Sequence, residues 1–252
     1  MKPPRILIIA GSDSSGGAGI QADIKTVTML GGYAMTAITA ITAQNTRGVT
    51  AVEVLSPDLV AAQIEACLAD IGVDAVKIGM LGSPSVAHRV ANLLEGLSAP
   101  VVFDPVMIAT SGAVLADAQT IAAFERLIRL AALVTPNVAE LAALGGDTGM
   151  AARGAAWLAK GGDAQGPMIE DRLVVPGQVP IVWQAARIET CHTHGTGCTL
   201  ASAIAAGLGA GLPLAAAVEQ GRAFVRAALQ AAPGFGAGHG PLGHQAVDTK
   251  AL

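Results

Sequence analysis

The chain alternates between short apolar runs and longer segments with the spacing of an amphipathic helix. The first unit is the apolar run 6–10, a glycine-rich loop over residues 11–19 and a helical segment over 20–30. Repeated strand–loop–helix units predict an α/β fold with a largely parallel central sheet and helices on both faces. Further strands are predicted over 34–40, 52–55, 75–79, 101–103 and 133–134, with helices over 57–70, 84–97 and 117–130.

Size and charge narrow the classes of protein that fit. The 252 residues are 52% hydrophobic, and no shift in composition marks a linker, so one domain over residues 1–252 is expected. A net charge of −4 with scattered Lys and Arg argues against nucleic acid as a partner. Three cysteines without disulfide spacing are typical of a reducing compartment, and no export signal is visible, so a cytoplasmic location is expected.

An uncharged stretch over residues 195–218 raises the question of a membrane span. The stretch is rich in Ala and Gly and is interrupted by Gly211-Leu212-Pro213. Both features fit a bilayer span poorly. Two packed helices and no membrane partner are therefore expected.

The most informative loop is Thr193-His194-Gly195-Thr196-Gly197-Cys198, which precedes one of these helices. The free N–H groups of a helix start, approached closely through glycine, form an anion site. Cys198 adds a titrating side chain where the helix dipole favours a thiolate. An alternative interpretation is a glycine loop before a buried helix, with Cys198 as a small core residue.

Two acids follow predicted strands. Asp104 comes directly after the strand over 101–103, and Glu140 lies one turn into the helix that follows Thr135-Pro136-Asn137. Because parallel strands deliver their carboxyl ends to one sheet edge, both acids are expected at the same site. Carboxylates with retained waters suit Mg²⁺. Glu140 alone could instead complement the helix dipole.

Other nucleotide and metal motifs are excluded or weak. Gly17-Ala18-Gly19 begins a match to the dinucleotide fingerprint, but a long loop separates it from the strand and no acid follows at the required distance. No Walker-type loop ending in Gly-Lys-Ser/Thr occurs. Cys191, His192 and His194 with Cys198 resemble a zinc cluster, but a glycine turn and helix start between them is a poor tetrahedral frame.

Taken together, several motifs resemble the hydroxymethylpyrimidine and phosphomethylpyrimidine kinases of thiamine biosynthesis, members of the ribokinase-like superfamily. The resemblance implies a ribokinase-like fold and transfer of the ATP γ-phosphoryl group to a pyrimidine hydroxymethyl group and then to the monophosphate. The motifs are Ala10-Gly11-Ser12-Asp13, residues 16–23, Ala43-Gln44-Asn45-Thr46, residues 77–81, Asp104-Pro105-Val106-Met107, Thr135-Pro136-Asn137 and residues 195–199.

The resemblance also implies roles for individual residues and for cofactors. Cys198 would act as the base where the superfamily usually has aspartate, if the helix dipole lowers the pKa of its thiol. ATP and Mg²⁺ are implied, a monovalent cation is an option, and a homodimer is a family-level expectation. The implied sets are Gly11, Asp23, Gln44, Met80 and Val106 around the pyrimidine, Gly195, Thr196 and Gly197 as anion hole, and Asp104 and Glu140 for Mg²⁺.

Gln44 has a physical basis as well. Its amide offers a donor and an acceptor together, which match the ring nitrogen and exocyclic amine of an aminopyrimidine. An alternative is a turn residue whose amide caps local backbone.

The chain departs from the family pattern around residue 160. The family has a strand that ends in Lys-Gly-Gly-His, and Lys160-Gly161-Gly162-Asp163 is similar. However, residues 151–160 are predicted as a helix that ends at Gly161, so a strand beside the ATP site would be missing, most simply because residues are absent from the chain. Thr110 stands where the family often has lysine, and the tail after residue 234 is only loosely similar.

Two other functions remain open. The first is a pyridoxal or pyridoxine kinase of the same superfamily. The second is a non-catalytic aminopyrimidine-binding protein that lost ATP handling with the missing strand. Phosphoryl-transfer assays distinguish them.

Overall fold

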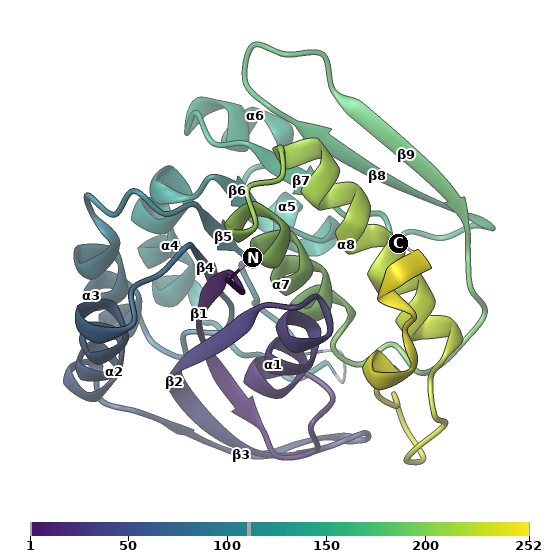
Figure 1. Cartoon of the computed structure of the whole chain (residues 1–252), viewed down its shortest axis with the longest axis horizontal. Helices are drawn as coiled ribbons and strands as arrows, with labels where there is room; N and C mark the ends of the chain where they lie inside the picture. The colour runs from purple at the N-terminus through teal and green to yellow at the C-terminus, as the bar shows by residue number, and fades with distance from the viewer. Residues whose placement is uncertain (1, 110–111, 252) are drawn as a thin grey trace.

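The core of the molecule is a mixed, mostly parallel β-sheet. In the computed structural model, which describes residues 2–109 and 112–251, nine strands pair in the order β3-β2-β1-β4-β5-β6-β7-β8-β9 (Figure 1). Six neighbouring strands from β2 to β7 run parallel, and β3, β8 and β9 extend the edges through antiparallel pairing. The strands are β1 (Arg5–Asp13), β2 (Tyr33–Asn45), β3 (Gly48–Val54), β4 (Ala75–Ile78), β5 (Val101–Phe103), β6 (Leu133–Val134), β7 (Trp157–Ala159), β8 (Met168–Val174) and β9 (Ile181–Ala186).

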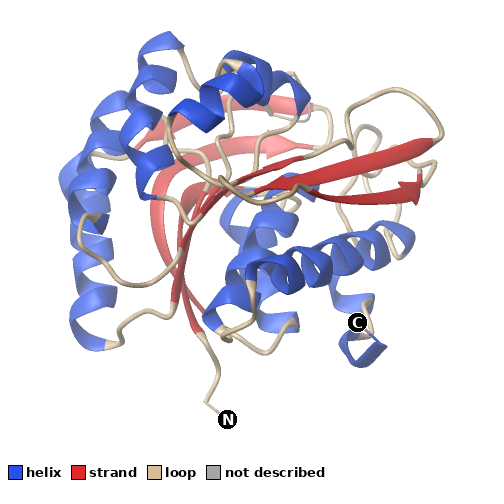
Figure 2. Cartoon of the chain, turned by 90° about the horizontal axis from the view of Figure 1, so that it is seen from above, coloured by secondary structure: helices blue, strands red, loops and turns tan. Residues whose placement is uncertain are grey.

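Helices cover both faces of the sheet, as predicted. Figure 2 shows the strands as a layer with helices on either side. Residues that alternate along β1 point to opposite faces, since Leu7 and Ile9 join one apolar cluster while Ile6 and Ile8 join the other. The helices are α1 (Gly19–Met29), α2 (Pro57–Asp70), α3 (Pro84–Leu94), α4 (Ala118–Leu130), α5 (Val138–Ala143), α6 (Gly146–Ala152), α7 (Thr196–Gly209) and α8 (Leu214–Gln230), with 3-10 turns over His244–Ala246 and Thr249–Ala251.

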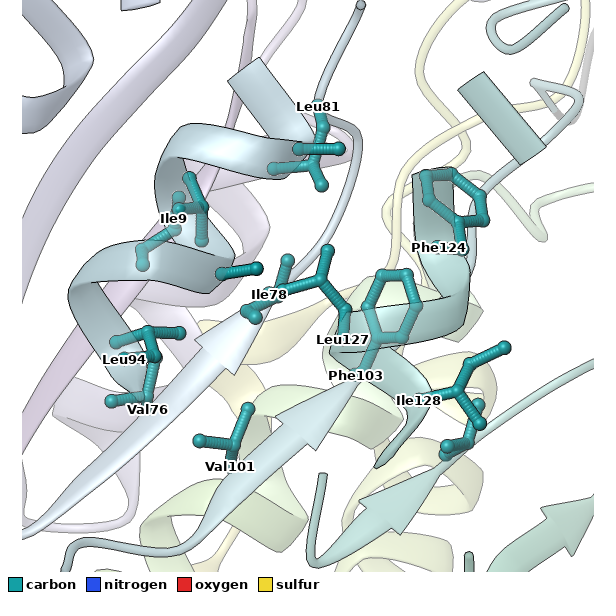
Figure 3. Packing of buried hydrophobic residues seen from close by; sticks show 14 of the residues in the cluster. Ile9, Val76, Ile78, Leu81, Leu94, Val101, Phe103, Phe124, Leu127 and Ile128 are labelled. Carbon is teal, nitrogen blue, oxygen red and sulfur yellow. The ribbon is translucent and has the colours of Figure 1, made fainter. Parts of the chain in front are cut away.

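The two clusters divide the helices between them. The first cluster packs α2, α3 and α4 on the sheet, and Figure 3 shows its centre, where the rings of Phe103 and Phe124 meet edge-on with centroids 5.1 Å apart. The second cluster packs α1, α7 and α8 on the opposite face. Helix α7 is therefore buried against the sheet, and its N-terminus is held firmly at the sheet edge.

Local signals set several boundaries as expected. Helix α2 has the predicted bounds, because the Ser56 side chain accepts a hydrogen bond from the Leu59 N–H and Pro57 occupies the first turn. The uncharged stretch forms α7 and the start of α8, and these two helices pack on each other. Among the described residues, no helix combines the length and apolar character that a bilayer span requires.

The predicted helix over residues 151–160 is wrong. Helix α6 ends at Ala152, and Gly154 at φ +70° turns the chain into strand β7. Trp157 and Leu158 are buried between β6 and β8. Pairing on both sides and burial outweigh the helix propensity of this Ala- and Leu-rich segment. No strand is missing, so Lys160 follows a strand end as in the family pattern.

Three further differences are local. Strand β1 continues to Asp13 with a bulge, so the loop after it is shorter than predicted. The tail after α8 folds back, with the N–H of His239 bonded to the carbonyl of Thr46 at the end of β2. Thr110, which stands where the family often has lysine, lies outside the described residues.

Candidate active site

A cavity of about 640 Å³ opens at the carboxyl ends of the parallel strands. This volume and position are typical of small-molecule sites in open α/β sheets. The residues predicted for the site line this cavity, with the exception of Asp23. Those residues are Gly11, Gln44, Met80, Val106, Asp104, Glu140, Gly195, Thr196, Gly197 and Cys198.

The start of α7 lies against the glycine loop that follows β1. Gly195 caps the helix at φ +89°, in the left-handed region that favours glycine. The first bond within the helix runs from the Thr199 N–H to the Gly195 carbonyl. Among the described residues, the N–H groups of Gly197 and Cys198 have no backbone acceptor, so they are available to an anion.

Replacing Gly195 by alanine is expected to collapse this contact. A Cβ there would lie 1.9 Å from the carbonyl oxygen of Gly17, so the two loops must separate. We expect a loss of about 2–3 kcal/mol of unfolding free energy. Gly211→Ala is the matched control, because Gly211 has φ +86° but no atom within 4 Å of an added Cβ. Equal destabilisation of both variants in chemical denaturation would contradict the contact.

Asp13 joins the two loops. Its carboxylate accepts hydrogen bonds from the N–H groups of Ser15 and Ala18 at 2.8 Å, and from Nε2 of His194 at 2.8 Å. Burial would raise the pKa of Asp13, but the bond from His194 and those from the loop hold it at about 2. The ionised carboxylate of Asp13 therefore joins His194, which precedes α7, to the loop after β1.

Gln44 faces the cavity from the end of β2. Its Oε1 accepts a hydrogen bond from the Thr42 hydroxyl at 3.1 Å, and its Nε2 lies 3.3 Å from Nε2 of His194. No contact of this amide with local backbone is present among the described residues, which argues against the turn-cap alternative. His194 directs Nε2 toward Asp13, so the Gln44 amide remains able to bind a ligand.

The expected thiolate at Cys198 is wrong. Burial raises the pKa of the Cys198 thiol to about 11, and Asp23 and Asp104 raise it further, while Lys77 opposes them. Desolvation thus outweighs the helix dipole, and the side chain is a neutral thiol at neutral pH. Cys198 nevertheless lines the cavity beside the anion site.

Asp104 and Lys160 form an ion pair opposite the start of α7. Lys160 Nζ donates to Asp104 Oδ1 at 2.8 Å, and the Thr135 hydroxyl donates to the same oxygen at 2.9 Å. A Cβ at Gly197 would lie 3.3 Å from Lys160 Nζ and 3.4 Å from Asp104 Oδ2. The absence of a side chain at Gly197 therefore leaves room beside one positive and one negative group.

Glu140 serves the helix and the cavity together. It forms a capping box with Asn137, in which its Oε2 accepts from the Asn137 N–H at 2.8 Å. Burial raises the pKa of Glu140 to about 7, and nearby Asp104 adds to this, although Lys160 opposes both. The helix interpretation holds, and the same carboxyl lines the cavity close to a second acid.

Asp23 does not line the cavity as expected. Its carboxylate is fully buried and binds Lys77 Nζ at 2.8 and 2.9 Å and the Ser202 hydroxyl at 2.7 Å. Burial would lower the pKa of Lys77, but Asp23 raises it above the ordinary lysine value. Asp23 therefore supports Lys77, which does reach the cavity.

Sequence reasoning missed Asp13, His194, Lys77 and Lys160 as site residues. Lys160 had a signal in its glycine motif, which the incorrect helix prediction obscured. His194 and Asp13 are 181 residues apart, so no local pattern could pair them. Among the described residues no group of three or more His, Cys, Asp or Glu side chains could hold a metal, and Cys191 contacts only its neighbour His192 while His194 binds Asp13.

Comparison with known proteins identifies the family of this chain. A family profile described as phosphomethylpyrimidine kinase matches residues 13–243. The hydroxymethylpyrimidine/phosphomethylpyrimidine kinase of Rhizobium meliloti (strain 1021) is 48% identical over 255 residues, covering 94% of this chain and 96% of that protein.

Solved structures share the fold. Phosphomethylpyrimidine kinase from Clostridium difficile 630 superposes with a TM-score of 0.75 at 38% identity, covering 88% of this chain and 98% of that chain. Pyridoxal kinase from Staphylococcus aureus in complex with AMP-PCP and pyridoxal superposes with a TM-score of 0.87 at 32% identity, covering 98% of this chain and 95% of that chain.

Proposed function

Because this chain belongs to the phosphomethylpyrimidine kinase family, we propose that it is an ATP-dependent kinase of thiamine biosynthesis. Its substrates are 4-amino-5-hydroxymethyl-2-methylpyrimidine and the monophosphate of that alcohol. One observation carries the proposal. The free N–H groups at the start of α7 share a cavity with Gln44, Lys160 and two buried acids.

The proposed reaction joins the hydroxymethyl oxygen to the γ-phosphorus of ATP while the bond from that phosphorus to the β–γ bridging oxygen breaks. The hydroxyl proton passes to the thiolate form of Cys198, which is a small fraction of the protein at neutral pH, and ADP leaves with the bridging oxygen. The N–H groups of Gly197 and Cys198, with Lys160, stabilise charge on the transferring group without reorganising. In the second reaction the acceptor is a phosphate oxygen instead of the hydroxyl.

Asp104 and Glu140 fit a magnesium ion. Two neighbouring buried carboxyls, one with its pKa raised to about 7, form a site where a divalent cation would relieve repulsion. Mg²⁺ needs only one or two carboxylates when substrate phosphates and waters complete its shell. When bound, the ion would neutralise charge on the β- and γ-phosphates.

The nucleotide base lies, in this proposal, at the end of the cavity that α8 bounds. Val225 and Leu229 on α8 line this cavity, as do Gln44 and Met80. The complex of the Staphylococcus aureus enzyme with AMP-PCP supports nucleotide binding in this fold. Three further properties stay predictions: a homodimer, a cytoplasmic location and use of a monovalent cation. Analytical ultracentrifugation tests whether the protein is a homodimer.

Substrate competition under limiting ATP tests the assignment. We expect Gln44→Ala to raise KM for the aminopyrimidine about tenfold, because the amide pairs with both donor and acceptor edges, and to change KM for pyridoxal much less. The Staphylococcus aureus likeness favours pyridoxal as the second candidate substrate. Preference of the unchanged enzyme for pyridoxal would overturn the proposal. The non-catalytic alternative loses its basis, since β7 is present.

The role of Cys198 predicts a pH dependence. With the thiol pKa raised to about 11, the thiolate fraction grows about tenfold for each pH unit below that value, so kcat should rise from about pH 7 to about pH 9. Cys198→Ala should lose at least about tenfold in kcat. Cys198→Asp should be partly active, and its rate should level off at a lower pH than that of the unchanged enzyme, because a carboxyl has a much lower ordinary pKa than a thiol. Equal activity of Cys198→Ala and the unchanged enzyme would remove Cys198 from the mechanism.

A further inference from the structure

An ion pair of two largely buried side chains lies where β8 and α8 border the cavity, and it takes no part in the reaction as described. Asp171 on β8 accepts a hydrogen bond from Arg222 Nε on α8 at 2.7 Å, and both side chains are 12% exposed. The Arg222 guanidinium lies 5.4 Å from the ring centroid of Trp183 on β9. Asp171 uses its other oxygen to accept from the Gly161 N–H at 3.0 Å.

The bond to Gly161 replaces a backbone pairing at the point where β7 ends. The ladder between β7 and β8 has its last pair at Ala159 and Arg172. Beyond it, the Lys160 N–H donates to the Pro136 carbonyl at 3.1 Å, and the next N–H turns to the Asp171 side chain. Gly161 lies so close to β8 that a Cβ would be 2.0 Å from the Glu170 carbonyl.

The turn held in this way carries Lys160. The Lys160 ammonium reaches Asp104 at 2.8 Å and lies beside Gly197 at the start of α7. The direction of this long side chain depends on the backbone on either side of its Cα. Pro136 in the loop after β6 and Asp171 on β8 fix that backbone. Asp171 is in turn fixed by Arg222 from a helix on the second face of the sheet.

We propose that Asp171, held by Arg222, is a positioning residue that aims Lys160 at the phosphates through the Gly161 N–H. This inference rests on the proposed function, because it assumes that Lys160 contacts the transferring group. The hydrogen bond from the Gly161 N–H needs an acceptor oxygen at residue 171, whereas the ion pair with Arg222 needs a negative charge there. Substitutions at residue 171 can remove the charge and keep the acceptor.

Steady-state kinetics of the full chain test the inference. Asp171→Ala should lower kcat/KM for ATP about tenfold and leave KM for the aminopyrimidine within about twofold. Asp171→Asn keeps an acceptor for the Gly161 N–H but turns its NH2 group toward Arg222 Nε, which is also a donor, so we expect a smaller loss of about threefold. Because Asp171→Ala leaves Arg222 without its partner, the double variant Asp171→Ala/Arg222→Ala is the second test and should show the same loss in ATP kinetics.

Arg172→Ala is the matched control. Arg172 follows Asp171 on β8 and pairs with Asp147 at 2.7 Å, away from the cavity. A purely structural effect of breaking an ion pair on this strand would lower the melting temperature and the active fraction in both variants alike. If Arg172→Ala lowers kcat/KM for ATP as much as Asp171→Ala, the inference is overturned.

A double-mutant cycle with Lys160→Ala separates the inference from the proposed function. If Asp171 acts through Lys160, Asp171→Ala should change kcat/KM for ATP by less than about twofold in the Lys160→Ala background. A full additional loss there overturns the inference while the kinase assignment stands. If Lys160→Ala itself has no effect, the assigned role of Lys160 and this inference both fall.

Discussion

Replacing Lys77 by methionine is expected to remove about 3–5 kcal/mol from the free energy of unfolding. The change leaves the Asp23 carboxylate fully buried with only the Ser202 hydroxyl as a partner. A buried charge without a counterion is costly, because the protein interior cannot replace the lost hydration. Chemical denaturation measures the loss. The double variant Lys77→Met/Asp23→Leu removes the unpaired carboxylate as well, and it should recover most of the lost free energy of unfolding.

The pH dependence of this loss has a definite sign. Burial raises the pKa of Asp23, and Lys77 is the main group that opposes this. A carboxyl with a raised folded-state pKa favours the folded state at low pH and loses that advantage as pH rises through its pKa. The stability difference between Lys77→Met and the unchanged protein should therefore shrink as pH falls toward the ordinary aspartate pKa of about 4.

An exposed ion pair provides the control for Lys77. Arg126 and Glu95 pair at 2.9 Å with side chains 42% and 68% exposed. Arg126→Met should cost less than about 1 kcal/mol, because water screens the pair. A similar small cost for Lys77→Met would mean that the Asp23 site takes up solvent or a proton without penalty.

Asp104→Asn is expected to lower kcat/KM for ATP by about 100- to 1,000-fold. The amide can still accept from the Thr135 hydroxyl, so the loop after β5 should keep its shape. The variant loses the charge that pairs with Lys160 and that would bind Mg²⁺ with Glu140. Magnesium titrations at fixed ATP should show a weaker activation constant along with the lower kcat.

Asp163→Asn is the matched change for Asp104. Asp163 also lines the cavity, but it is exposed and binds no other described side chain. We expect kcat/KM to stay within about threefold. Equal losses in the two variants would indicate that net charge in the cavity, rather than the position of Asp104, controls the reaction.

Much of the fold follows from local chemistry. Helix α2 has its predicted bounds because Ser56 and Pro57 mark its start, and β5 and β6 were located from apolar runs of three and two residues. The segment 151–160 was misassigned because Ala and Leu favour helix in isolation. Residues 157–159 form a strand because they pair with β8, and this pairing between separate segments cannot be recognised from residue order alone.

The candidate site divides in the same way. Residue type and spacing indicate the glycines at 195 and 197 and the acids after two strands, whereas the family resemblance indicates Gln44. All of them line one cavity. The ionisation of Cys198 was not predictable. The helix dipole is a local effect, whereas the burial that raises the thiol pKa to about 11 comes from packing.

The alternation of strands and helices, the glycine turns and the residue types at the strand ends follow from residue order, because they depend on neighbours along the chain. The tertiary structure alone decided which charges meet. Asp13 with His194, Asp23 with Lys77, and Asp171 with Arg222 are 181, 54 and 51 residues apart. Their pairing and burial, and therefore their ionisation, arise only when the sheet brings distant strands together and excludes water.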